Sequence, residues 1–196
     1  NVKEIVSAKA GKIKQTIVVS ALGGVTNKLV DCAFLASSGD ESYKEILSEV
    51  EARHINLCNT LIPVSHRSNT ITQVKLLLND LEDICRGVFL IQELSPRSSD
   101  HILSFGERLS STIIQDYFLS SGLDSRLLDP RLLIKTDAQF GNAVVDVERT
   151  FSLLNEAYSN PADVSLCPGF MASSNVGNHT TTLGRGGSDY TAALIA

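Results

Sequence analysis

Residues 16–36 read TIVVSALGGVTNKLVDCAFLA, and this stretch decides the expected fold. The β-branched run Thr16–Ser20 predicts a buried strand, because it is short, apolar and followed by a glycine turn at Gly24. Apolar residues then recur at helical spacing from Thr26 to Ala36, which predicts a helix. A strand, a glycine turn and a helix in this order begin a βαβ unit. We therefore expect an α/β fold with a mainly parallel sheet.

Three long helical stretches follow, at about residues 41–61, 69–92 and 98–121. The apolar face of the second is made by Ile71, Val74, Leu77, Leu78, Leu81, Ile84 and Cys85. Ser95-Pro96 is expected to break the chain before the third helix, and Ser98 or Ser99 to cap it. A helical insert of this kind, about residues 41–121, usually covers a sheet or forms a subunit contact.

Strand-like segments return after the insert. The expected strands are residues 125–129, 132–135, 143–147, 164–167, 170–174 and 180–183. A helix is expected over 148–159, and the tail of another over 2–10, into which Asn1 opens without a cap. Asn175–Asn178, between the last two strands, is a strong signal for an antiparallel hairpin.

Composition limits the class of protein. Apolar residues make up 43% and charged residues 20% of the 196 residues, the balance of a soluble globular protein of one ordinary domain. No apolar run reaches the roughly 18 residues that a membrane span needs. The formal net charge of −5 argues against a general nucleic-acid or membrane-surface binder. We therefore expect neither nucleic acid nor membrane as a partner.

The four cysteines are widely spaced and form no CxxC pair. This pattern suits reduced, mostly buried thiols in a cytosolic protein, so a cytoplasmic location is expected. His54 and Cys58 would share a helix face, which makes a metal site conceivable, but no second ligand pair follows and no metal site is predicted.

Ser20–Asn27 is the first segment that could carry chemistry. It joins a strand to a helix, where open α/β sheets bind ligands. The amides of Gly23 and Gly24 can approach an anion, and the helix N-terminus adds partial positive charge. The alternative is a tight turn in which Thr26 or Asn27 only caps the helix.

The second segment is Ser104–Ser111, on the third long helix. Gly106 costs about 1 kcal/mol relative to alanine inside a helix, so a close approach of a backbone or ligand would explain it. Glu107 beside it could face a cationic amine. The alternative is a packing glycine beside a solvated Glu107-Arg108 pair.

The third segment is TTTLGRGGSDYTAAL, residues 180–194. A β-branched strand runs into a glycine turn that carries Arg185, whose planar fork suits a carboxylate. Ser188 or Asp189 could be the N-cap of the helix that follows. Capping does not explain three glycines around one arginine, so a binding role is favoured here.

Together these segments resemble a known family. GRGGSDYTAALIA, preceded by PGFMASSNVGNHTTTL, is similar to the signature of the aspartate kinases in the amino-acid kinase superfamily. VVSALGGVTNKLV and SFGERLSS resemble two further motifs of that family, in family order and spacing. The resemblance implies a three-layer αβα amino-acid kinase fold, of which residues 1–196 are the N-terminal, aspartate-binding part.

The resemblance also implies an activity. The family uses MgATP to phosphorylate the side-chain carboxylate of L-aspartate, giving 4-phospho-L-aspartate, the first step of lysine, threonine and methionine biosynthesis. ATP and Mg²⁺ are therefore the implied cofactors and L-aspartate the implied substrate. No general base is required, because a carboxylate with a pKa of about 3.9 is already ionised near pH 7.

Roles for individual residues follow from the same resemblance. Thr26 and Glu107 match aspartate-binding positions, Glu107 taking the ammonium group, and Arg185 clamps a carboxylate. Ser20, Gly23 and Gly24 lie near the reacting carboxylate and the transferred phosphoryl group. Ser188 and Asp189 are the implied catalytic residues, close to the reacting centre, with Asp189 orienting a lysine or a substrate group.

The family pattern extends beyond this chain at both ends. Its initial Lys-Phe-Gly-Gly-Thr-Ser-like strand, its ATP-binding lobe and its ACT domains have no counterpart here, so we expect residues 1–196 alone to lack kinase activity. Some relatives are fused to homoserine dehydrogenase, and the family usually forms homo-oligomers. The alternatives are a kinase for another small acid of the superfamily and a non-catalytic amino-acid-binding fragment.

Overall fold

The computed structural model describes residues 2–196, and Asn1 lies outside them. The helices are α1 (Val2–Lys9), α2 (Val25–Ser37), α3 (Tyr43–Leu61), α4 (Val64–Ile91), α5 (Pro96–Ser120), α6 (Pro130–Leu133), α7 (Val147–Ala157) and α8 (Gly187–Ile195). The strands are β1 (Gln15–Val19), β2 (Ser125–Leu127), β3 (Lys135–Thr136), β4 (Val164–Pro168), β5 (Met171–Ser174) and β6 (Thr180–Thr182). The mixture of helices and strands confirms the predicted α/β class.

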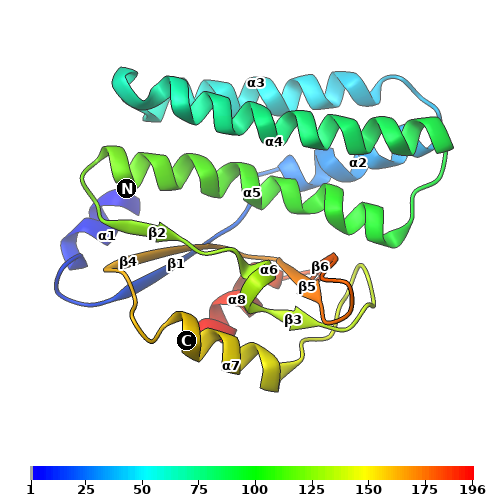
Figure 1. Ribbon diagram of the computed structural model, residues 1–196. Helices are drawn as coiled ribbons and strands as arrows, with labels where there is room; N and C mark the ends of the chain where they lie inside the picture. The colour runs from blue at the N-terminus through cyan, green and yellow to red at the C-terminus, as the bar shows by residue number, and fades with distance from the viewer. Residues whose placement is uncertain (1) are drawn as a thin grey trace.

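The strands form two small sheets, which lie next to each other because the central strand of the first, β4, is followed in the chain by the central strand of the second, β5 (Figure 1). The first has the order β1-β4-β2 and is parallel throughout, with Ile17 opposite Leu166. The second has the order β3-β5-β6, with β3 parallel and β6 antiparallel to β5. The predicted mainly parallel sheet with one antiparallel hairpin is therefore confirmed.

Helices cover the sheets in layers (Figure 1). α5 runs along the first sheet, with Phe118 packed against Val164 and Leu166. α3 and α4 form an outer pair above α2 and α5, and α7 and α8 lie below the sheets. The largest core cluster fills the space among α2, α3, α4 and α5. Within the predicted insert of about 41–121, α3 and α4 thus form the outer layer, and α5 lies between them and the sheets.

β1 is less buried than predicted. Every residue from Gln15 to Val19 is half-buried, because β1 is an edge strand that pairs only with β4 among the described residues. The run Thr16–Ser20 was predicted to be a buried strand, and composition alone does not separate a fully buried strand from an edge strand that helices partly cover.

Two predicted strands are wrong in whole or in part. Of 132–135, the first two residues belong to α6 and only Lys135 lies in a strand, β3. The helix forms because Asp129 caps it through the amide of Arg131 and Pro130 takes the first helical position. Residues 143–147 contribute only a single bridge from Val145 to Thr136. The amide of Val144 donates to the side-chain carboxylate of Asp137, so it is not available for a hydrogen bond to a neighbouring strand.

The caps also differ from the prediction. Ser95, and not Ser98 or Ser99, is the N-cap of α5: its hydroxyl accepts from the amide of Ser98 at 3.0 Å, and Pro96 follows at the first helical position. The helix at the end of the chain, α8, is preceded by Gly186 in the left-handed conformation, and it has no side-chain cap. Ser188 and Asp189 are therefore not its N-cap.

The four cysteines are all buried and free, as predicted from their spacing. His54 is also buried, and its Nδ1 lies 2.7 Å from the carbonyl of Val50. Within residues 2–196 no three side chains of His, Cys, Asp or Glu gather as metal ligands. None of the helices of these residues is both long and apolar enough to span a membrane.

Candidate functional site

A cavity of about 310 Å³ lies beyond the carboxyl ends of β1 and β4. Parallel sheets commonly bind ligands at this edge, because loops and helix N-termini converge there. All the lining residues except Phe170 come from the three segments singled out in the sequence: Ser20, Thr26, Glu107, Gly184, Arg185, Gly186, Gly187, Ser188 and Asp189. Six of the eight residues assigned to the site thus share one cavity, and Gly23 and Gly24 lie in the adjoining loop.

Ser20 joins the two sides of the cavity. It directly follows β1, and its hydroxyl donates to the hydroxyl of Ser188 at the start of α8, at 2.8 Å. The carbonyl of Ser20 accepts from the Ser110 hydroxyl on α5, also at 2.8 Å. The end of β1 is therefore fixed to α5 and α8, two of the three helices that border the cavity; the third is α2, which contributes Thr26.

Glu107 brings a buried carboxylate into the cavity. Its side chain is only 3% exposed, and Oε1 accepts from the amide of Ala21 at 3.1 Å. Oε2 has no hydrogen-bond partner in the structure, so one oxygen of a buried acid remains free for a ligand. Burial raises the pKa of Glu107 to about 7, although the hydrogen bond from Ala21 opposes that shift. A cationic ligand would stabilise the charged form.

Gly106 is explained by the same contact. A Cβ at this position would lie 2.8 Å from the Cβ of Ala21, closer than side-chain carbons approach. Glycine lets α5 approach the end of β1 closely enough for the carboxylate of Glu107 to reach the amide of Ala21. The close approach predicted from this helical glycine is therefore made by Ala21, just after the end of β1.

Arg185 lies in the glycine loop between β6 and α8. Gly184 and Gly186 on either side both have positive φ, 71° and 75°, a conformation that favours glycine. Arg185 is exposed, and among the described residues it forms no ion pair with a carboxylate. Its five donors are available to an anion in the cavity. Asp189 is exposed nearby, in the first turn of α8.

The loop before α2 has the geometry expected of an anion-binding turn. Gly24 precedes the helix with φ 81°, and no side chain caps α2, so Thr26 and Asn27 are not caps. A Cβ built on Gly23 would meet no atom within 4 Å, which leaves open space above this part of the backbone. In the first turn of α2 the amides of Val25 and Lys28 donate to backbone carbonyls, and those of Thr26 and Asn27 remain available to a ligand.

The sequence interpretation missed Phe170, which forms one wall of the cavity. Its φ of 68° is unusual for a bulky residue. Two hydrogen bonds hold it there: its amide donates to the hydroxyl of Thr191 at 3.2 Å, and its carbonyl accepts from Leu183 at 2.8 Å. The sequence did offer one indication: Phe170 comes two residues after the end of β4, next to the strand-breaking pair Pro168-Gly169.

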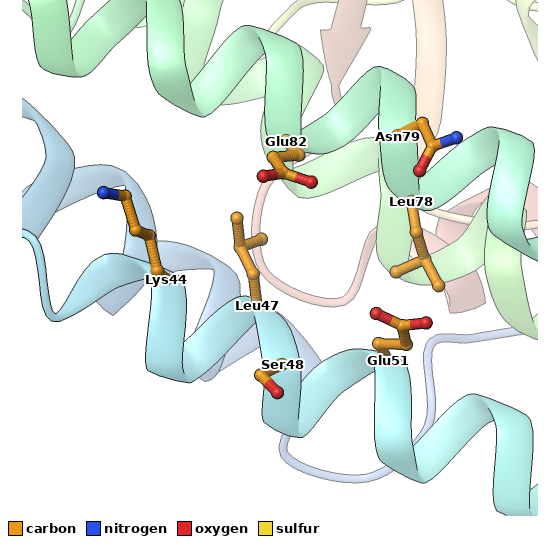
Figure 2. Close-up of a pocket in the computed structure, with 7 residues that line it drawn as sticks. All are labelled: Lys44, Leu47, Ser48, Glu51, Leu78, Asn79 and Glu82. Atoms are coloured by element: carbon orange, nitrogen blue, oxygen red, sulfur yellow. The ribbon is translucent and has the colours of Figure 1, made fainter.

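Two other hollows fit a ligand less well. Figure 2 shows one on the outer helical layer, between α3 and α4, where Lys44, Glu51 and Glu82 surround an opening of about 190 Å³. Two of these charges pair with other exposed residues, Lys44 with Glu41 and Glu51 with Lys75. It lies far along the insert from the strand ends where the three motifs meet.

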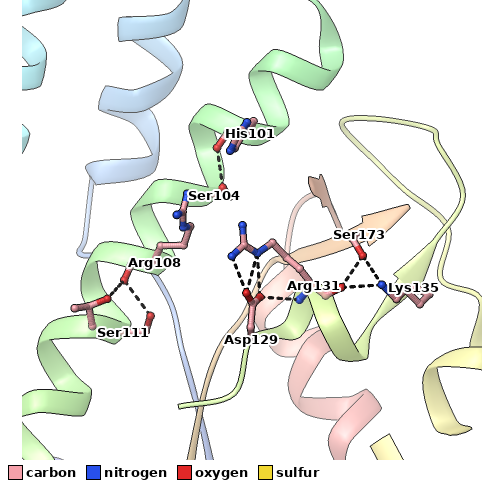
Figure 3. Close-up of polar contacts among 9 residues, drawn as sticks. His101, Ser104, Arg108, Ser111, Asp129, Arg131, Lys135 and Ser173 are labelled. Carbon is pink, nitrogen blue, oxygen red and sulfur yellow. Dashed lines mark hydrogen bonds and ion pairs between the residues drawn. The ribbon is translucent and has the colours of Figure 1, made fainter. Parts of the chain in front are cut away.

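The other hollow, of about 210 Å³, lies where β2 and β4 end and includes Arg108 and Arg131. Figure 3 shows that Arg131 already donates hydrogen bonds to both oxygens of Asp129. Although burial raises it, the pKa of Asp129 is held below its usual value by hydrogen bonds from Arg131. Arg108 lies over the ring of Phe105 at 4.2 Å. Both charges thus have internal partners, unlike Glu107 and Arg185.

Comparison with known proteins agrees with the motifs. The model of the amino acid kinase family matches residues 1–196. An aspartokinase of Chlamydia trachomatis is 33% identical over 180 residues, which are 91% of this chain and 38% of that protein. The bifunctional aspartokinase/homoserine dehydrogenase 2 of Zea mays is 27% identical over 184 residues, 93% of this chain and 20% of that protein.

A solved structure gives the same result for the fold. Aspartokinase III of Escherichia coli, in complex with aspartate and ADP, matches with a TM-score of 0.86 and 27% identity. The match covers 99% of this chain and 42% of that one. The resemblance to aspartate kinases and the predicted amino-acid kinase fold are confirmed, and the chain spans less than half the length of each of these relatives.

Proposed function

The chain belongs to the amino acid kinase family, and from this premise we propose that it is the aspartate-binding part of an aspartate kinase. One observation carries the proposal. The free oxygen of buried Glu107 and the unpaired guanidinium of Arg185 line the same cavity. An amino acid with an extra carboxylate supplies the ammonium for the first and a carboxylate for the second.

The remaining roles are those that the resemblance implies, and positions in the cavity or in the loop beside it support them. Thr26 contacts the substrate from the first turn of α2. Ser20 and the amides of Gly23 and Gly24 lie beside the reacting carboxylate and the phosphoryl group that it receives. Ser188, held by Ser20, and Asp189 stand near the reacting centre from the start of α8.

The chemistry requires positioning and positive charge. The side-chain carboxylate of aspartate is ionised near neutral pH and attacks the γ-phosphorus of ATP without a base, giving 4-phospho-L-aspartate and ADP. Two anions must be brought together, so helix amides and cations carry the catalysis. Asp189 therefore orients a lysine or a substrate group and does not remove a proton.

ATP, the second substrate, binds to a part of the parent protein outside residues 1–196. The match to only 42% of an aspartokinase that binds ADP supports this division. Mg²⁺ arrives with the phosphates of ATP, since this ion usually takes few protein ligands at such sites. Residues 1–196 alone bind aspartate and do not phosphorylate it.

The parent protein has further properties in this proposal. It carries regulatory ACT domains, forms a homo-oligomer and acts in the cytoplasm, in the first step of lysine, threonine and methionine biosynthesis. Relatives that are much longer than this chain, one of them bifunctional, support a longer parent.

A hydroxylamine trap tests the activity. With ATP, Mg²⁺ and L-aspartate, the parent protein should form an acyl phosphate that hydroxylamine converts to a hydroxamate. Absence of ATP-dependent hydroxamate from the parent contradicts the proposal, and its formation by pure residues 1–196 contradicts the division of roles.

A matched pair of variants tests Asp189. Asp189→Asn in the parent should lower kcat far more than it raises KM for aspartate. Asp83→Asn, which alters an exposed carboxylate on α4, should change neither. Equal effects of Asp189→Asn on kcat and KM count against its orienting role.

A further inference from the structure

We propose that Asp100 is a positioning residue that fixes the arginine loop, so that α5 sets the distance between the two ends of the substrate pocket. The inference rests on the proposed function, because it concerns how aspartate is held between Glu107 and Arg185. Asp100 itself does not line the cavity.

Asp100 is a buried carboxylate whose hydrogen bonds all lead away from its own helix. Its side chain is 1% exposed. The amide of Thr182 donates to Oδ2 at 3.0 Å, and the hydroxyl of Thr182 donates to Oδ1 at 2.7 Å. The amide of Gly141 donates to both oxygens, at 3.0 and 2.9 Å. These donors come from β6 and from the loop before α7.

The two segments that Asp100 joins also touch each other. The amide of Ala143 donates to the carbonyl of Thr182 at 3.0 Å. A Cβ on Gly184 would lie 2.6 Å from the side-chain oxygen of Asn142, so the glycine loop packs closely on this neighbour. The carboxylate of Asp100 therefore joins both β6 and the loop before α7 to the N-terminal part of α5.

Thr182 is the last residue of β6, and Arg185 follows three residues later. The flanking residues Gly184 and Gly186 have no side chains with which to anchor the loop. On the β6 side the loop is held by Asp100 at Thr182 and by the bond from Leu183 to the carbonyl of Phe170, and the amide of Gly187 closes the turn on the carbonyl of Gly184 at 3.0 Å. Loss of Asp100 would leave the buried amide of Thr182 unpaired, remove the acceptor of the exposed Gly141 amide, and leave the loop free to move.

α5 also carries Glu107, seven residues after Asp100. Seven residues are close to two helical turns, so both carboxylates lie on one face, about 10 Å apart along the axis. One holds the loop of Arg185, and the other enters the cavity. Because a helix is rigid at this length, the separation of the ammonium and carboxylate subsites is built into one element. We expect the pocket to be selective for the length of the amino acid for this reason.

Calorimetric titration of the 196-residue chain with L-aspartate tests the positioning role through a double-mutant cycle of Asp100→Ala and Arg185→Lys. Lysine keeps the charge of Arg185 but loses the planar fork, so each single variant should bind roughly tenfold more weakly. If Asp100 acts through Arg185, the double variant should bind about as weakly as Arg185→Lys alone. Multiplication of the two losses would overturn the inference.

Three further variants separate positioning from general stability. Asp100→Asn should restore most of the affinity, because one amide orientation accepts from the Thr182 amide and donates to the Thr182 hydroxyl. Asp116→Asn removes a charge from the same helix far from the loop and should bind like the wild type. Where Asp100→Ala does not fold, Thr182→Val replaces it in the cycle, and the same non-additivity is expected.

The relative affinities for L-aspartate and L-glutamate give an independent readout. Asp100→Ala should reduce the preference for aspartate, whereas a merely structural loss lowers the amount of binding-competent protein and leaves the preference unchanged. If the wild-type chain does not bind aspartate, the proposed function fails. If the wild type binds and Asp100→Ala binds equally well, only this inference fails.

Discussion

Ser20 and Ser188 stand 168 residues apart in the sequence, and their side-chain oxygens share a hydrogen bond of 2.8 Å. This bond connects the end of β1 to the first turn of α8, the two segments from which most of the cavity opens. Gly169, directly after β4, allows α8 to come this close, because any side chain there would collide with the backbone of Ser188.

Gly169→Ala should therefore displace α8. The added Cβ would lie 2.6 Å from the Cα of Ser188, and backbone cannot move aside as a flexible side chain can. We expect a loss of about 2 kcal/mol or more in the free energy of unfolding, measured by urea denaturation. Gly23→Ala is the matched control: it meets nothing within 4 Å and should change stability by less than about 0.5 kcal/mol. Equal tolerance of both variants would contradict the packing of α8.

Gly106→Ala and Gly87→Ala should have opposite effects on stability. Both glycines lie in helices, but only the Cβ at Gly106 meets a neighbour, Ala21 at 2.8 Å. Gly87→Ala should stabilise the protein by up to about 1 kcal/mol through helix propensity. Gly106→Ala should destabilise it by about 1–3 kcal/mol through overpacking. Thermal unfolding of the two variants side by side checks the signs, and stabilisation by both would show that α5 does not press on Ala21.

Aspartate binding should depend on the charge of Glu107. Since its pKa lies at about 7 in the free protein, affinity should rise between pH 6 and 8 as the carboxylate ionises. Below this pKa the affinity should fall by roughly tenfold per pH unit. Glu107→Gln should bind at least about tenfold more weakly at pH 8 and lose this pH dependence. Calorimetry across the range measures both, and a retained slope in the variant would assign the titration to another group.

Glu107 should also affect stability in the absence of ligand. Its pKa is about 7 in the folded state and 4.5 without burial, so between these values the folded protein holds a proton that the unfolded chain has lost. Stability from this group is therefore complete below pH 4.5 and declines as pH rises to 7, by on the order of 3 kcal/mol. Relative to the wild type, Glu107→Gln should gain stability over this interval. A difference between the two proteins that is constant with pH would contradict the burial of this acid.

Much of the fold could be predicted from local patterns. The long helices α3, α4 and α5 have apolar faces that repeat over many turns, and the hairpin between β5 and β6 has a strong turn signal. The short elements were harder. Asp129-Pro130 is a cap followed by a favourable first helical residue, yet the apolar residues after it suggested a strand. Val145 lies in a short apolar stretch that suggested a strand, but the amide of its neighbour Val144 donates to the carboxylate of Asp137 and not to another strand.

The candidate site was predicted as three separate segments, and the structure brings them to one sheet edge. Motif residues such as Glu107 and Arg185 were accessible to sequence reasoning because their surroundings in the chain are unusual for a helix or a turn. Phe170 and Asp100 were not, because their importance lies in contacts with residues distant in the sequence. A backbone conformation of positive φ and a carboxylate that joins two loops leave little trace in a single sequence.

The central claim is that this cavity binds the zwitterion of aspartate between Glu107 and Arg185. Calorimetric titration of the chain with L-aspartate, L-glutamate and N-acetyl-L-glutamate at pH 8 tests it most directly. We predict binding of aspartate, weaker binding of glutamate, and no binding of the N-acetylated acid, whose amide offers no ammonium to Glu107. Binding of N-acetyl-L-glutamate as tight as that of aspartate, or no binding of aspartate, would contradict the account.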